Sequence, residues 1–98
     1  MITDIEYDVG VGGNVFVTKN DEFFDFEIIE FEENDNGAIG IEVNGNGDSW
    51  IINDVYNRNA LPNAQDVNSD EYNKIFNDIK SKVIGTIRIN IESFFENN

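Results

Sequence analysis

The sequence predicts an α+β fold, an antiparallel β-meander of four to five strands with one face covered by a C-terminal helix. Residues 1–52 repeatedly alternate apolar and polar side chains, which is typical of half-buried strands. Runs rich in Asn, Asp and Gly separate these segments at short intervals, as in serial hairpins. Residues 69–95 change to apolar side chains at helical spacing, and they provide the cover that the apolar face of the sheet requires.

The first two strands are expected at residues 4–11 and 15–18, joined by a tight turn at residues 12–14. A turn at residues 19–21 then leads into the third strand. Within that strand the alternation changes phase at Ile28-Ile29. Apolar residues occupy even positions from Phe24 to Ile28 and odd positions from Ile29, and the acidic residues change in the opposite sense. One extra residue at this point would keep the acids on one face, so the sequence predicts a β-bulge there.

Two further turns, at residues 34–37 and 44–48, enclose a fourth strand at residues 39–43. A short fifth strand is expected at residues 50–52. Residues 53–68 lack a regular pattern and contain the only proline of the chain, so they are expected to form a loop.

The helix is expected to begin after Asn68, because Asn68 followed three residues later by Glu71 resembles a capping box. One helix over about residues 69–95 is the first choice. A shorter helix that ends at Gly85 is the alternative, because residues 86–92 also alternate and could form a last strand.

The composition bounds the chemistry of the chain. Its 98 residues suffice for one small domain with one core, and they include neither cysteine nor histidine. Thiolate metal sites, disulfides and the usual Ser-His-Asp and Cys-His sites are therefore excluded. Residues 32–43 partly imitate a calcium-binding EF-hand loop, but Val43 stands where the twelfth residue should be a glutamate ligand. We expect no enzyme activity, no cofactor and no metal.

The charge is large and lies mostly in one half. Twenty acidic residues face six basic ones, giving a net charge of −14, of which −12 belongs to residues 1–50. Such a field opposes direct binding to nucleic acid or to an anionic membrane and favours a basic partner. The N-terminal residues do not resemble a signal peptide and no apolar run is long enough to cross a membrane, so a cytoplasmic location is expected.

The acids are expected to gather on the face of the sheet that the helix leaves open. Side chains two apart on a strand are separated by about 6.6 Å, which is close to the spacing of alternate phosphates along a DNA strand. The expected partner-binding residues are Asp4, Glu6, Asp8, Asp25, Glu27, Glu30, Glu32, Glu33, Asp35 and Glu42.

In its small size, strong acidity, lack of Cys and His and lack of catalytic signals, the whole chain resembles phage DNA-mimic inhibitors of the anti-restriction and anti-CRISPR type. The resemblance is one of composition and not of a family motif. It implies an inhibitor, in the host cytoplasm, that occupies the basic nucleic-acid-binding groove of a restriction enzyme, a CRISPR effector, a DNA-repair enzyme or a nucleoid protein. The resemblance is also compatible with a homodimer.

Two alternatives remain open at the level of sequence. An immunity protein or antitoxin that neutralises a basic nuclease toxin would have much the same composition. In a structural or virion accessory domain, the charge would serve only solubility.

Overall fold

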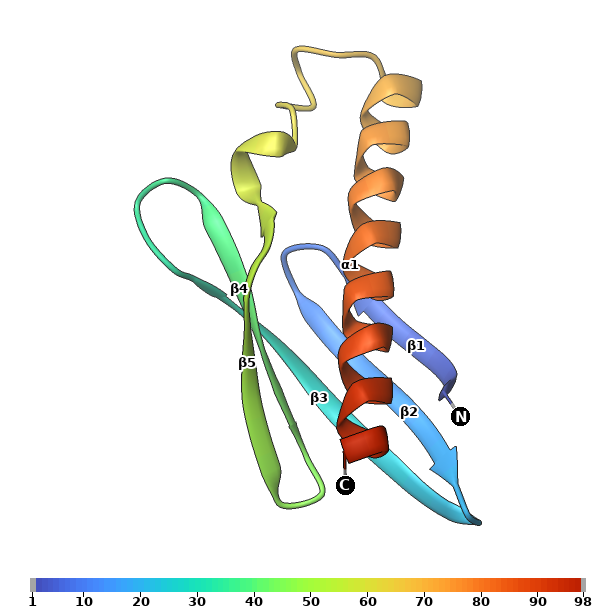
Figure 1. Ribbon diagram of the computed structural model, residues 1–98. Coiled ribbons are helices and arrows are strands. Elements are labelled where there is room, and N and C mark those ends of the chain that lie inside the picture. The colour runs from blue at the N-terminus through green and yellow to red at the C-terminus, as the bar shows by residue number, and fades with distance from the viewer. Residues whose placement is uncertain (1, 98) are drawn as a thin grey trace.

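The computed structural model describes residues 2–97, whose strands form one open antiparallel sheet with one α-helix, α1, across one face (Figure 1). Strand order follows chain order, as expected for a meander, and the predicted α+β class is confirmed. The elements are β1 (Ile2–Asp8), β2 (Gly12–Lys19), β3 (Glu22–Glu32), β4 (Ala38–Gly45), β5 (Asp48–Asn57), the short 3-10 helix η1 (Arg58–Ala60) and α1 (Ser69–Asn97).

Two of the hairpins use the turn residues that the sequence singles out. Asn20 and Asp21 between β2 and β3 have positive φ, as do Asn46 and Gly47 between β4 and β5. Paired positive φ values match the twist of a two-residue hairpin turn, and Asn, Asp and Gly tolerate them best.

The first hairpin differs from the prediction, because residues 12–14 belong to β2 and the turn lies at residues 9–11. The amide of Val11 closes this turn by donating to the Asp8 carbonyl at 3.0 Å. Gly13 instead pairs with Tyr7 inside the ladder, and a Cβ on Gly13 would lie 2.0 Å from the Glu6 carbonyl oxygen. This glycine is therefore required by the close approach of β1 and β2.

The predicted β-bulge at Ile28-Ile29 is wrong. β3 pairs regularly with β2 and with β4 through this region, so side chains alternate without interruption. As a consequence Glu30 faces the helix, whereas Ile29 lies on the opposite face, where it is 40% exposed. The predicted bulge would keep Glu30 in water. It is not needed, because the Glu30 carboxylate accepts hydrogen bonds on the helix side.

The loop predicted for residues 53–68 begins later than expected, because β5 continues to Asn57. An irregularity in the β4–β5 ladder between Ile39 and Ile41 accommodates extra residues of β5, with Asp54 at a φ of 53°. The following Tyr56 is buried and pairs with Ile39. Because the backbone is irregular here, apolar and polar residues do not alternate along this part of β5, and the sequence pattern does not indicate a strand.

The helix spans Ser69–Asn97, so the alternative of a last strand is not formed. The side chain of Asn68 caps it, with Oδ1 accepting from the Glu71 amide at 2.8 Å, which is one half of the predicted capping box. Val83, Ile87 and Ile91 recur every fourth residue and are fully buried against the sheet. The first turns of α1 extend past the β1–β2 hairpin, beside residues 58–68 (Figure 1).

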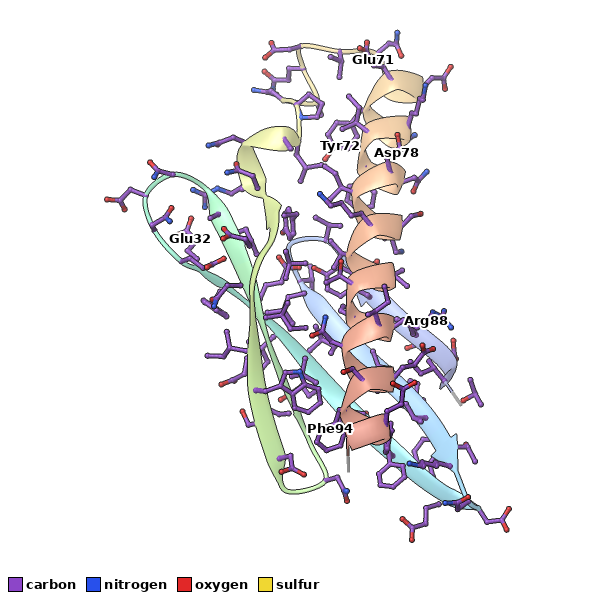
Figure 2. All side chains as sticks on the ribbon, in the orientation of Figure 1. Glu32, Glu71, Tyr72, Asp78, Arg88 and Phe94 are labelled. Carbon is purple, nitrogen blue, oxygen red and sulfur yellow. The ribbon has the colours of Figure 1, made fainter. Side chains whose placement is uncertain are left out.

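The core lies between α1 and the helix-facing side of the sheet. Phe26, in the central strand β3, is fully buried and makes edge contacts with Trp50, Phe94 and Phe95. Phe94 at the end of α1 also stacks on Trp50, with ring centroids 4.8 Å apart (Figure 2). This aromatic cluster fixes the C-terminal half of the helix over one face and leaves the other face of the sheet uncovered.

Candidate functional site: the open face of the sheet

The uncovered side of the sheet, called the open face below, is defined by strand register. Buried residues such as Val15, Phe26 and Val43 face the helix, and the residues between them point the other way. The open face consists of Asp4, Glu6, Asp8, Gly12, Asn14, Phe16, Thr18, Phe23, Asp25, Glu27, Ile29, Phe31, Gly40, Glu42, Asn44, Ser49 and Ile51.

Six of the ten predicted partner-binding residues lie together on this face, and none of them is directly opposite another. β1 contributes three acids, β3 two and β4 one: Asp4, Glu6, Asp8, Asp25, Glu27 and Glu42. Each is paired across the ladder with an uncharged residue; Glu27, for example, lies between Asn14 and Asn44. Because like charges directly opposite each other destabilise a sheet, this arrangement lets the face hold many carboxylates.

The acids of β1 and β3 form two parallel rows, called the β1 row (Asp4, Glu6, Asp8) and the β3 row (Asp25, Glu27). Within a row, neighbouring acids are about 6.6 Å apart along the strand. The rows lie two strands apart, at a separation of about 9.5 Å. The strand between them, β2, places only uncharged side chains on this face.

The basic residues of the protein lie elsewhere. Lys19, the only basic residue in the strands, faces the helix, where Nζ donates to the Phe95 carbonyl at 3.2 Å. Arg88 is an exposed residue on the flank of α1 (Figure 2). Within residues 2–97 a single ion pair reaches the open face, between Lys80 Nζ and Asp8 Oδ1 at 3.4 Å. The remaining acids of the open face therefore keep their negative charge unpaired.

Apolar side chains interrupt the charge of the open face. Phe23 is 66% exposed and Ile51 is 56% exposed. The Phe23 ring stacks on Phe16, with centroids 5.8 Å apart and planes 20° from parallel. These apolar residues are not among the predicted partner-binding residues. The sequence nevertheless indicates one exposed ring at Phe23-Phe24, because two adjacent aromatic residues of a strand must point to opposite faces.

Glu30, a predicted partner-binding residue, lies on the helix side and is fully engaged there. One of its carboxylate oxygens, Oε2, accepts from the Tyr7 hydroxyl and from the Gly10 amide at 2.8 Å. The other oxygen, Oε1, accepts from the Tyr56 hydroxyl. Tyr7 and Tyr56 come from the two edge strands of the sheet, so this carboxylate joins both edges to the central strand.

The cluster also changes the acidity of the two tyrosines. Burial, then the hydrogen bond to Glu30 and the charge of that carboxylate, raise the pKa of the Tyr7 hydroxyl far above its ordinary value. The same causes, in the same order, raise the pKa of Tyr56. Both hydroxyls thus stay protonated donors, and the cluster serves the fold rather than a surface contact.

The other three predicted residues lie near the β3–β4 turn, off the open face. Glu32 is on the helix side of β3 and forms an ion pair with Arg58, and it lies on the opposite side of the view from Arg88 (Figure 2). Glu33 accepts from the Asp54 amide at 2.7 Å. Asp35 is exposed in the turn itself.

Other kinds of site find little support in the part of the chain that the structure describes. No group of three or more acidic side chains is arranged to hold a metal ion within residues 2–97. A cavity of about 270 Å³ that is open to solvent borders the Glu30 cluster and is lined in part by Tyr56, Arg58 and Leu61. The described helices include none with the combination of length and apolar character needed to span a membrane.

Comparison with known proteins adds no relative: no family model, no curated protein and no solved structure matches the chain.

Proposed function

We propose that the protein is a non-catalytic acidic inhibitor that uses the open face to occupy the basic nucleic-acid-binding groove of a defence or DNA-processing protein. The observation that carries the proposal is the pair of carboxylate rows on β1 and β3. Their spacing of about 6.6 Å along each strand is close to that of alternate phosphates, and the rows flank an uncharged strip as phosphates flank a groove. A groove lined with Lys and Arg would attract this face over a long range.

A test compares the protein with two variants of equal net charge. The first removes four of the five carboxylates of the two rows by Asp4→Asn, Glu6→Gln, Asp25→Asn and Glu27→Gln, and it keeps Asp8, which is paired with Lys80. The second, the matched control, removes four charges from the loop and α1 by Asp66→Asn, Asp78→Asn, Glu92→Gln and Glu96→Gln. Each immobilised protein is exposed to a nuclease-treated bacterial lysate, and retained DNA-binding proteins are challenged with duplex DNA and assayed for activity.

The expected result is that wild type and control retain a DNA-binding protein, inhibit it and release it to competing DNA, whereas the row variant does none of these. Equal retention by the row variant and the control would mean that the rows are not the binding surface. Binding should also weaken steeply with salt, because charges on an exposed face are screened.

The exposed apolar side chains favour a second candidate, an immunity protein or antitoxin. Phe23 and Ile51 have no counterpart in a phosphodiester backbone, and they suit a tailored protein surface better than a general DNA groove. Under this alternative the retained protein is a nuclease toxin, and bound inhibitor is displaced poorly by DNA.

A further inference from the structure

We propose that the open face carries an arginine-docking site, centred on the Phe16–Phe23 ring pair and flanked by Asp4 and Asp25. Strand register places Phe16 directly between the two acids, opposite Asp4 on β1 and opposite Asp25 on β3. This inference rests on the proposed function and specifies its partner, which is a protein that inserts an arginine side chain between the β1 and β3 rows.

The ring pair presents an aromatic surface to solvent. Phe23 is 66% exposed, and its ring lies nearly parallel to that of Phe16. The face of an aromatic ring carries partial negative charge and attracts a cation placed over it. Exposure of the Phe23 ring is unfavourable in water, so contact with a partner surface would relieve a cost that the isolated chain bears.

The flanking carboxylates suit a planar cation. Asn14 Nδ2 donates to Asp25 Oδ1 at 2.9 Å, which orients that carboxylate and leaves Oδ2 open. Within residues 2–97 neither Asp4 nor Asp25 has a lysine or arginine of the protein within ion-pair distance. Lys19, the nearest basic residue in sequence, is held on the other face by its contact with Phe95.

Arginine fits this combination better than lysine. A guanidinium group stacks flat on an aromatic ring and still donates two parallel hydrogen bonds to a carboxylate in its own plane. The ammonium group of lysine is a compact, strongly hydrated charge and does neither well. Carboxylates alone also favour arginine through paired hydrogen bonds, so the part of the preference that depends on the Phe23 ring is the part that reports on this site.

The experiment measures the affinity of nona-arginine and nona-lysine peptides by isothermal titration calorimetry at physiological ionic strength. Wild type is expected to bind nona-arginine about fivefold more tightly than nona-lysine, which is the scale of a cation–π contact at an exposed site. Phe23→Leu keeps an apolar side chain but removes the ring, and it should reduce this preference to less than about twofold. The control Ile51→Ala, which removes another exposed side chain of the same face, should leave the preference unchanged.

Equal affinities of wild type for the two peptides, or a preference that survives in Phe23→Leu, would overturn the arginine site. Neither outcome would affect the carboxylate rows as a surface for cations. The four-residue row variant tests that broader proposal separately: if it binds both peptides as tightly as wild type does, the proposed function itself fails.

Discussion

Replacing either Tyr7 or Tyr56 by phenylalanine should make the fold less sensitive to alkaline pH. Both hydroxyls donate to Glu30 in the folded protein, so ionisation there would remove a donor and place two negative charges together. The pKa of each hydroxyl is therefore higher in the folded state than the ordinary value of about 10 in the unfolded chain. The stabilisation that results is complete below pH 10 and is lost progressively as pH rises from there toward the folded-state pKa.

The slope of the free energy of unfolding against pH depends on how many protons the folded state keeps and the unfolded state has lost at that pH. Each such tyrosine lowers the free energy of unfolding by about 1.4 kcal/mol per pH unit above pH 10. Tyr7 and Tyr56 together therefore contribute a slope of about 2.7 kcal/mol per pH unit, and either single variant should halve that contribution. At pH 8 each variant should also lose about 1.5–3 kcal/mol, because one hydrogen bond to a charged acceptor is removed.

Urea unfolding followed by the fluorescence of Trp50, the only tryptophan, measures this slope. Trp50 packs against Phe26 and Phe94 in the core, so its emission reports on the loss of tertiary structure. Tyr72→Phe is the matched control, because Tyr72 lies on α1 and stacks on Phe76 rather than contacting the Glu30 cluster. If the Tyr7 and Tyr56 variants kept the full wild-type slope above pH 10, the reasoning would be refuted.

Three further substitutions test the fold and the open face by the same unfolding measurement. Gly85→Ala should stabilise by about 0.5–1 kcal/mol, because the site is helical and a new Cβ meets no atom within 4 Å; a loss of stability would contradict this. Asn68→Ala should cost about 1 kcal/mol by removing the helix cap, and no change would mean that the cap is dispensable. Asn14→Asp places an acid between Glu6 and Glu27 and should cost roughly 0.2–1 kcal/mol per pair beyond the uncharged control Asn14→Thr. That excess should shrink at high salt, and its persistence would rule out charge repulsion as the cause.

The fold could be predicted from the sequence largely because alternation and helical spacing report on each element locally. The phase slip at Ile28-Ile29 shows where this local information ends. The pattern leaves two solutions, a bulge that moves Glu30 outward or a regular strand that turns it inward. The second prevails because Tyr7 and Tyr56 converge on Glu30, and that convergence depends on the curvature of the whole sheet.

The open face could be predicted only in part for the same reason. The acids of the β1 and β3 rows, together with Glu42, follow the regular alternation of their strands, so six acids were placed together correctly. The exposed ring of Phe23 and its stacking on Phe16 were missed, because apolar residues in a strand are usually assigned to the core. The alternation around Phe24 and Phe26 nevertheless requires Phe23 to point outward.

The composition of the open face favours a binding surface over one that serves only solubility. Opposite charges across a ladder stabilise a sheet, and a face of mixed sign is as compatible with water as an acidic one. Here the strands place no basic residue on the open face, and uncharged partners such as Asn14 separate the acids instead. The face also exposes Phe23 and Ile51, and the Phe23 ring stacks on Phe16, so part of the face is apolar. Contact with a cationic, partly apolar protein surface would neutralise the acids and bury these apolar side chains at once, which is the interaction that the proposed function requires.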